Sequence, residues 1–355
     1  MSVSLNYANL EAASPVGLSI GLFCNKSRFV AKVTPGQIVT RQVQPPRQEQ
    51  PVGLEAARAK VQASGYNGKM SPRTRQNVVG MLGEWFNAKK AEKGKVFNTV
   101  NAAARLFTFC TLTLCSTQMH DDNYIKRHGL NRFLQECKRA FGVQTFFWRG
   151  EPQRNGNLHF HILFAQELPW EWIRSTWNNI LSDMGYLQIY KSRQEAVHAE
   201  GFKPSTNPND KRTIAQQVKA YRDGLACGWS NPNSTDIHRL QKTKNAAAYV
   251  CKYVSKDAGS RKIDGRIWGC SDDLRELKAP EVSITQEFMK RLNGEVKRGK
   301  IELIQYDHVA VYRGDIGLML TRVAPQLLTE LEKHYSTISK KLSSLRPLAI
   351  PQAQT

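Results

Sequence analysis

Several features are scarce or missing in this sequence of 355 residues, and each absence excludes a class of protein. No apolar run approaches the roughly 18 residues that a membrane helix needs. The N-terminus has no basic stretch followed by an apolar stretch, so we expect no secretory signal. The seven cysteines, an odd number, include no Cys-x-x-Cys pair, which argues against a zinc ribbon and a disulfide framework. A reducing cytoplasm therefore fits best.

Acidic residues are also scarce. The chain has 30 Asp and Glu against 51 Lys and Arg, a formal net charge of +21. So large a positive field attracts a polyanion and indicates nucleic acid as the default partner. Residues 151–200 are the exception, with 4 basic and 6 acidic residues. A basic chain with one acidic block is expected if DNA binds broadly and a divalent cation binds at one place.

The pattern along the chain predicts four segments. Residues 1–50 read as an irregular arm or linker, because "TRQVQPPRQEQP" favours no packed element. Residues 51–100 read as a basic helical region, with Ser71 and Pro72 opening a helix. Residues 101–275 hold the motifs described below. Residues 276–355 are a C-terminal accessory region, in which we expect a strand over "IELIQYDHVAVYR" and a final helix over Pro325 to Leu345.

The central segment predicts an α+β fold. "LFTFCTLTL" favours a central strand, and an amphipathic helix follows from Leu130 to Phe141. The strand "VQTFFWRGE", a turn at "PQRNG" and the strand "GNLHFHILF" predict a hairpin. A helix from Pro169 and a strand at "YLQIYKS" come next, and the turn-rich residues 198–245 read as surface excursions. Mixed order with a hairpin indicates a central sheet with antiparallel strands, covered by helices.

Two histidines interrupt the apolar strand "GNLHFHILF". His159 and His161 are two residues apart, so in a strand both imidazoles point to the same face. Two converging imidazoles are a metal-ligand arrangement, although an isolated His-x-His is more often a pair of partly buried strand residues. Hard divalent ions also require oxygen ligands. Glu151 returns close to this strand across the hairpin and is our candidate third ligand, with Gln144 and Gln153 as weaker candidates.

A second cluster lies in "AAAYVCKYVSKD". On a helix Tyr249 and Tyr253 are four residues apart on one face, and Lys252 and Lys256 have the same spacing beside them. A tyrosine hydroxyl can attack phosphorus when a metal polarises the phosphate. Neighbouring ammonium groups would favour the phenolate. An amphipathic helix with half-buried tyrosines and solvated lysines is the alternative.

Together these motifs resemble those of the HUH endonucleases that initiate rolling-circle replication. The resemblance rests on the "TLTL" strand, the His-hydrophobe-His strand and the Tyr-x-x-Lys-Tyr-x-x-Lys segment, over roughly Leu106 to Ser271. The "TLTLCS" segment lacks the proline that usually ends the first motif. The paired tyrosines are similar to the two-tyrosine branch found in replication proteins of single-stranded DNA phages.

The resemblance implies a fold, an activity and partners. The fold would be an RRM-like HUH palm over residues 101–275, the nickase catalytic domain, flanked by additional N- and C-terminal helical regions. His159 and His161 would bind Mg²⁺ or Mn²⁺. Tyr249 or Tyr253 would nick origin DNA, keep the 5′-phosphate and release a 3′-OH for synthesis, and the displaced strand would later be rejoined. The partners would be single-stranded or supercoiled origin DNA and a host helicase and polymerase, in the bacterial host cytoplasm and without a membrane.

Three alternatives remain open at the level of sequence. A mobilisation relaxase or a single-strand transposase would use the same chemistry, but relaxases generally place the tyrosine before the histidine strand. A non-catalytic protein could bind single-stranded DNA by stacking bases on its aromatic rings (Trp148, Trp170, Trp172 and Tyr249). A zinc hydrolase is disfavoured, because no further His or Cys is arranged as a ligand near the pair. No Gly-x-x-x-x-Gly-Lys-Ser/Thr loop is present, so we expect no attached helicase.

Overall fold

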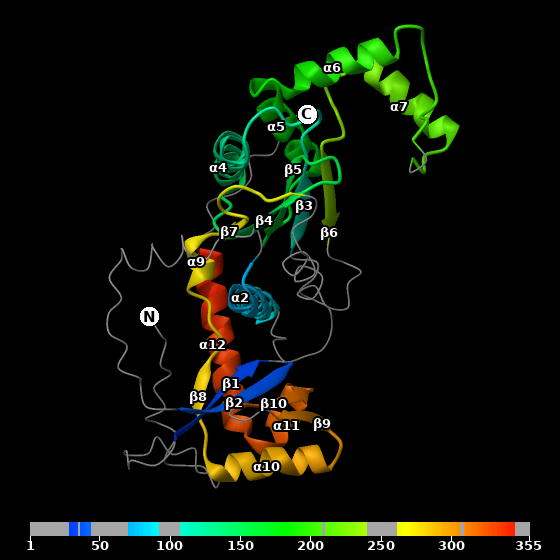
Figure 1. Ribbon diagram of the computed structural model, residues 1–355. Helices are drawn as coiled ribbons and strands as arrows, with labels where there is room; N and C mark the ends of the chain where they lie inside the picture. The colour runs from blue at the N-terminus through cyan, green and yellow to red at the C-terminus, as the bar shows by residue number, and fades with distance from the viewer. Residues whose placement is uncertain are drawn as a thin grey trace.

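The computed structural model describes residues 28–34, 36–43, 70–91, 107–207, 210–239, 261–305 and 309–344. Within these ranges the chain forms two five-stranded antiparallel sheets and a set of helices, so the predicted α+β class is confirmed. Figure 1 shows the sheets at opposite ends of the molecule, with helices α2 (Pro72–Ala91) and α12 (Pro325–Ser344) between them. None of the described helices is long and apolar enough to cross a membrane.

The first sheet has the strand order β6-β3-β5-β4-β7. Its strands are β3 (Thr108–Leu112), β4 (Phe146–Pro152), β5 (Leu158–Phe164), β6 (Thr235–Arg239) and β7 (Trp268–Cys270). As predicted, β4 and β5 form a hairpin, and β3 lies inside the sheet between β5 and β6. The two histidines are therefore on the middle strand.

Helix α2 covers one end of the histidine-bearing face of this sheet. Cys270 shares that face, because it pairs with Phe147 in an antiparallel register. The Cys270 Sγ atom is 3.8 Å from Met81 Sδ of α2. The ring of Trp85 packs edge-on against Phe107, with centroids 5.0 Å apart. The helix predicted to open at Ser71 and Pro72 is confirmed, and the Ser71 hydroxyl accepts a hydrogen bond from Thr74 N–H at 3.1 Å.

Further helices complete the core around the first sheet. They are α3 (Asp122–Tyr124), the π-helix η2 (Ile125–Leu130), α4 (Asn131–Phe141) and α5 (Trp170–Asp183). Phe133 and Cys137 of α4 and Trp177 of α5 are buried in the same core as the strands. The helices predicted before Phe141 and after Pro169 are confirmed.

The predicted strand "YLQIYKS" is wrong. It begins helix α6 (Tyr186–Val197), directly after Gly185 at φ +82°. The alternation in this stretch is too short to separate strand from helix, and the Lys, Arg, Gln, Glu and Ala residues that follow are strong helix formers. Helix α7 (Ile214–Ala226) agrees with the helical segment expected near Ile214. Figure 1 shows α6 and α7 extending away from the first sheet.

The interpretation of residues 198–245 as surface excursions alone is also wrong, because Thr235–Arg239 forms the edge strand β6. The strand pairs with β3 along its whole length. Its sequence, "TDIHR", has one apolar residue, so hydrophobic alternation gives no signal there. An edge strand with one side open to solvent tolerates such polar residues.

The second sheet corrects the expectation of an irregular arm over residues 1–50. Strands β1 (Arg28–Thr34) and β2 (Gln37–Val43) form a hairpin. They join β8 (Glu281–Ser283), β9 (Ile301–Gln305) and β10 (Val309–Gly314) in the order β8-β1-β2-β10-β9. Ala31, Val33 and Ile38 are buried against α10 (Gln286–Lys297), α11 (Ile316–Val323) and α12 in a second core. The N-terminal hairpin and the C-terminal region thus form one folding unit.

Helix α12, which agrees with the predicted terminal helix, connects the two cores. Its Leu327 and Leu331 belong to the second core, whereas Leu342 belongs to the first. Between them, the buried hydroxyl of Tyr335 donates a 2.7 Å hydrogen bond to Glu84 Oε2 of α2. Burial raises the pKa of Glu84 from 4.5 to about 7, against the opposing effect of hydrogen bonds from Tyr335 and Asn87. This carboxyl group is therefore a titratable element in the contact between α2 and α12.

Candidate metal centre

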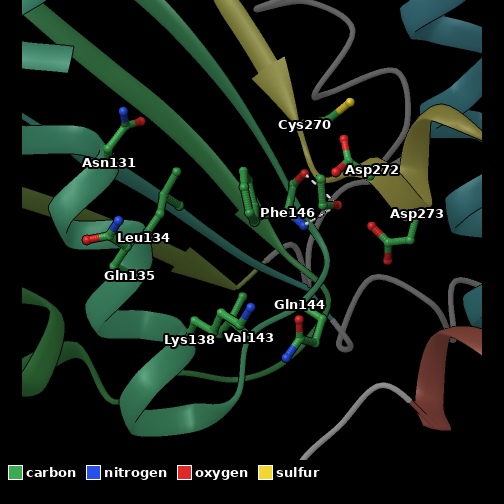
Figure 2. A pocket seen from close by; sticks show the side chains of 11 residues that line it. Asn131, Leu134, Gln135, Lys138, Val143, Gln144, Phe146, Cys270, Asp272 and Asp273 are labelled. Carbon is green, nitrogen blue, oxygen red and sulfur yellow. Dashed lines mark hydrogen bonds between the residues drawn. The ribbon is translucent and has the colours of Figure 1, made fainter. Parts of the chain in front are cut away.

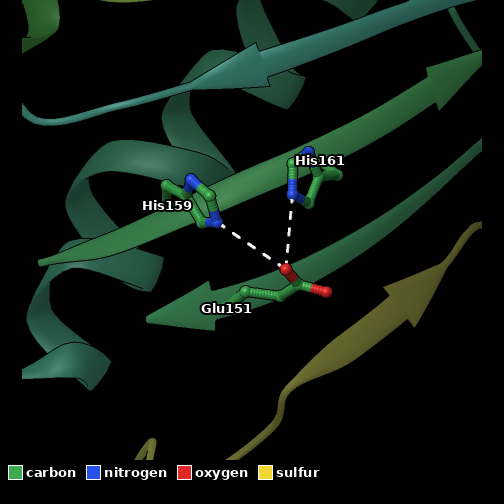
Figure 3. Close-up of side chains that lie close together, drawn as sticks. All are labelled: Glu151, His159 and His161. Carbon is green, nitrogen blue, oxygen red and sulfur yellow. Dashed lines mark ion pairs between the residues drawn. The ribbon is translucent and has the colours of Figure 1, made fainter. Parts of the chain in front are cut away.

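Glu151, His159 and His161 meet on one face of the β4–β5 hairpin. The antiparallel register places Glu151 opposite His159 and Arg149 opposite His161. Figure 3 shows both imidazoles directed at the carboxylate of Glu151. The Oε2 atom of Glu151 is 3.8 Å from His159 Nε2 and 3.6 Å from His161 Nε2. The hairpin thus brings together the three residues that the sequence selected as metal ligands.

The turn between the strands sets this register. Gln153 N–H donates to Asn157 O at 2.7 Å, and Gly156 N–H donates to Gln153 O at 2.9 Å. Gly156 has φ +85°, a left-handed conformation that favours glycine. The Asn157 side chain donates to Ser116 O at 2.8 Å, which fixes the turn against the segment after β3. Register matters here because a slip of one residue would move both histidines to the other face.

The spacing of the three side chains fits a divalent cation. Potential ligand atoms of all three residues lie within 4.8 Å of one another. Ligands bound about 2.1 Å from one ion are about 3 to 3.5 Å apart, slightly closer than the nitrogen–oxygen distances here. The side chains are only 5% exposed for Glu151, 9% for His161 and 16% for His159. A small contraction would therefore enclose an ion in a largely dehydrated site.

The other nitrogen of His161 also has a partner. Its Nδ1 atom is 3.0 Å from Thr111 Oγ1 of β3. Phe109, two residues earlier on β3, stacks on the same imidazole with centroids 5.5 Å apart. For Nε2 to bind a metal, Nδ1 must carry the proton and donate it to the threonine hydroxyl. By contrast, His159 Nε2 is buried and has no hydrogen-bond partner within the described residues.

Sequence reasoning missed several side chains beside this group. Thr111 gave a signal that was available, because it lies in the "TLTL" strand and shares a face with Phe109. Arg149 is 2% exposed, lies opposite His161 and donates from Nη1 to Ile267 O at 3.1 Å. It places a positive charge next to the carboxylate. Asp122 and Arg261 are 139 residues apart and had no signal in the sequence.

The weaker ligand candidates lie elsewhere. Gln144 lies beyond the end of β4 that is remote from Glu151, and Gln153 belongs to the turn. Figure 2 shows Gln144 at an open cleft of about 520 Å³ between α4, β4 and β7. This cleft is lined by Asn131, Leu134, Gln135, Lys138, Val143, Gln144, Phe146, Cys270, Ser271, Asp272 and Asp273. Neither glutamine belongs to the Glu-His-His group.

The residues of the second predicted cluster, Tyr249, Lys252, Tyr253 and Lys256, lie outside the described residues. The same holds for the stacking role assigned to Tyr249. Of the tryptophans in that alternative, Trp148 is 8% exposed and Trp170 is 53% exposed. Trp172 packs edge-on against Phe141, with centroids 4.6 Å apart. Among these three rings, Trp170 is therefore the one that can offer a base an open face.

Comparison with known families gives an independent result. Residues 107–258 match the model of a family of replication-associated proteins, described by its member ORF2. The match indicates a replication initiator. It spans the Glu-His-His group and both predicted tyrosines, and it agrees with the region in which the sequence motifs resemble rolling-circle initiators. No curated protein and no solved structure matches the chain.

Proposed function

We propose that this protein is a metal-dependent, site-specific DNA nickase and strand transferase that starts and ends rolling-circle replication. The observation that carries the proposal is the position of the Glu-His-His group, on a sheet inside the region that matches the family. A divalent cation bound there would polarise the scissile phosphate. The proposed ion is Mg²⁺ or Mn²⁺, since a carboxylate and imidazoles suit either one.

The proposed chemistry is a phosphoryl transfer to tyrosine. The hydroxyl oxygen of Tyr249 or Tyr253 forms a bond to phosphorus while the bond from phosphorus to the 3′ oxygen breaks. The 3′ oxygen leaves as a hydroxyl group, and the proton it gains balances the one that the phenol loses. Lys252 and Lys256 stabilise the phenolate or hold a phosphate oxygen. Attack by a 3′-OH on the phosphotyrosine reverses the step and rejoins a strand.

The partners follow from this chemistry and from the charge. The net charge of +21 favours a protein that binds origin DNA through many phosphate contacts. A 3′-OH serves a host polymerase, and unwinding falls to a host helicase in the bacterial host cytoplasm. We further propose that residues 101–275 are the catalytic domain, with the remainder as accessory regions.

Incubation of supercoiled origin plasmid with the protein and Mg²⁺ or Mn²⁺, followed by protease, tests the proposal. We expect nicked circles that retain a peptide on the 5′ end. Plasmid that stays unbroken in every metal, with binding intact, would instead support a non-catalytic DNA-binding protein. A relaxase or transposase of the same chemistry would also leave a 5′ peptide. Addition of helicase and polymerase separates these, because only an initiator yields single-stranded circles by continued synthesis.

A further inference from the structure

An ion pair joins the two chain segments that flank the proposed catalytic face. Both oxygens of Asp122 accept hydrogen bonds from Arg261, each 2.7 Å long, from Nη1 and Nη2. Asp122 follows β3 and opens helix α3, and Arg261 is the first described residue after position 260. Such a paired geometry gives orientation as well as attraction, because the planar guanidinium matches the carboxylate.

The same arginine also contacts the turn that precedes the histidine strand. Arg261 Nε donates to Gly156 O at 2.6 Å, and Nη2 donates to Gln118 Oε1 at 3.2 Å. That Gln118 oxygen accepts a 2.7 Å hydrogen bond from Leu158 N–H, directly before His159. Arg261 is therefore linked to the strand of the metal centre both directly, through the turn, and through one intervening side chain.

A second set of contacts holds the residues after Arg261. Asp264 N–H donates to Asp122 Oδ2 at 3.0 Å. The ammonium of Lys126 donates to the carbonyl oxygens of Asp264 and Arg266. Gly265 has φ +69°, and a Cβ atom there would lie 2.5 Å from Asn123 Oδ1. The backbone of 264–266 is thus packed against helices α3 and η2.

Asp122 remains ionised throughout the physiological pH range. Its side chain is 2% exposed. Burial acts to raise the pKa of this carboxyl, but hydrogen bonds from Arg261, Gln118 and the Asp264 backbone outweigh it and lower the pKa to about 2. The pair is therefore a permanent structural contact rather than a switch.

These contacts lie at one end of the segment that carries the predicted tyrosines. Before the segment, β6 pairs with β3, and Asp236 lies opposite Thr111, which itself lies opposite His161. After the segment, Arg261 contacts the turn before His159. Both points at which the described chain stops and resumes are thus attached to the strands of the metal centre.

We infer that Asp122 and Arg261 form an anchor that positions the tyrosine segment relative to Glu151, His159 and His161. This inference rests on the proposed function, and it makes both members of the pair positioning residues. Displacement of a nucleophile by about 1 Å can reduce a rate about 100-fold, so an anchor at the end of its segment affects the rate of attack. It should not affect the affinity of the metal centre, whose ligands lie on β4 and β5.

Adduct formation on a short single-stranded origin oligonucleotide tests this role in the full-length chain. The Arg261→Gln and Asp122→Asn variants should lose about 10- to 100-fold in the maximal rate at saturating DNA. Their KM for the oligonucleotide and their Mn²⁺ affinity, measured by titration without DNA, should stay within about twofold of wild type, given a role limited to orientation. Arg261→Lys keeps the charge but not the paired donors, so it should recover only part of the rate.

Arg212→Gln is the matched control, because Arg212 makes a similar paired contact with Asp210 at 2.9 and 2.6 Å, remote from the first sheet. It should leave the rate unchanged. Wild-type adduct formation in both variants, or a fall in Mn²⁺ affinity parallel to the fall in rate, would overturn the inference. If Arg261→Gln unfolds at the assay temperature, Arg261→Lys decides by the same criteria. Absence of any adduct with the wild-type chain would instead refute the proposed function.

Discussion

The hydroxyl of Thr111 lies 3.0 Å from Nδ1 of His161 and thereby determines which imidazole nitrogen is available to a metal ion. The two residues are directly opposite in the antiparallel pairing of β3 with β5. A partner on the second nitrogen fixes both the orientation of the ring and the position of its proton. The first strand of the sheet therefore supports the metal centre without supplying a ligand.

Thr111→Val should weaken Mn²⁺ binding about tenfold, because loss of such a partner typically costs a metal site 10- to 100-fold in affinity. Thr111→Ser keeps the hydroxyl and is the matched control. Titration of each variant with Mn²⁺ measures the effect. Equal affinities for the Val variant and wild type would show that the hydroxyl does not orient His161.

His159→Ala and His161→Ala should each abolish nicking of origin plasmid and leave most duplex binding intact. Duplex binding depends on dispersed Lys and Arg contacts to phosphate, whereas the histidines serve one site. Gel assays of nicking and binding on the same preparations separate the two effects. Nicking at the wild-type rate in either variant would be incompatible with the proposed metal site.

Glu151→Ala should weaken metal affinity, and excess Mn²⁺ should restore part of the nicking activity. The carboxylate oxygen is the hard ligand of the group, and a higher ion concentration compensates for its loss by mass action. Glu195→Ala, which removes an exposed carboxylate from α6, is the control and should match wild type. An unchanged metal titration for Glu151→Ala would remove this residue from the centre.

The paired tyrosines predict alternating attack. A rolling-circle initiator must cut again after a full turn, while the first tyrosine is still bound to the parental 5′ end. Each single variant, Tyr249→Phe or Tyr253→Phe, should therefore still form some adduct on a single-stranded origin oligonucleotide, and the double variant should form none. Peptide mapping identifies the modified residue. Adducts on one tyrosine only, with normal circle closure when the other is replaced, would contradict the alternating scheme.

Glu84 predicts a pH-dependent stability. Its pKa is raised from 4.5 to about 7 in the folded protein, so the unfolded chain ionises first as the pH rises. Stability therefore falls between about pH 4.5 and pH 7 and levels off above the folded pKa, a loss of about 3 kcal/mol for this group alone. Glu84→Gln still accepts the Tyr335 hydrogen bond but cannot ionise. Thermal unfolding at several pH values should show a flatter profile for the variant, and parallel profiles would contradict this assignment.

Much of the proposed site could be predicted from sequence because its parts are close in the chain. Alternation with period two places His159 and His161 on one face, and a short turn brings Glu151 back to the same strand. The terminal helix and the helix after Ser71 were predictable for a similar reason, since their apolar residues repeat at helical spacing. Where local patterns were short or polar, as at Tyr186–Val197 and Thr235–Arg239, the predictions were wrong.

The sequence by itself therefore determined the type of chemistry, through the residues available for it, the positive charge and the ligands that lie within one hairpin. Only the tertiary structure decided which distant segments support that chemistry. It paired Thr111 with His161, joined Asp122 to Arg261, and placed the hairpin of residues 28–43 in one sheet with residues 281–314. Periodicity constrains neighbours along the chain, whereas strand order and long-range ion pairs depend on how whole elements pack, and no local pattern encodes that packing.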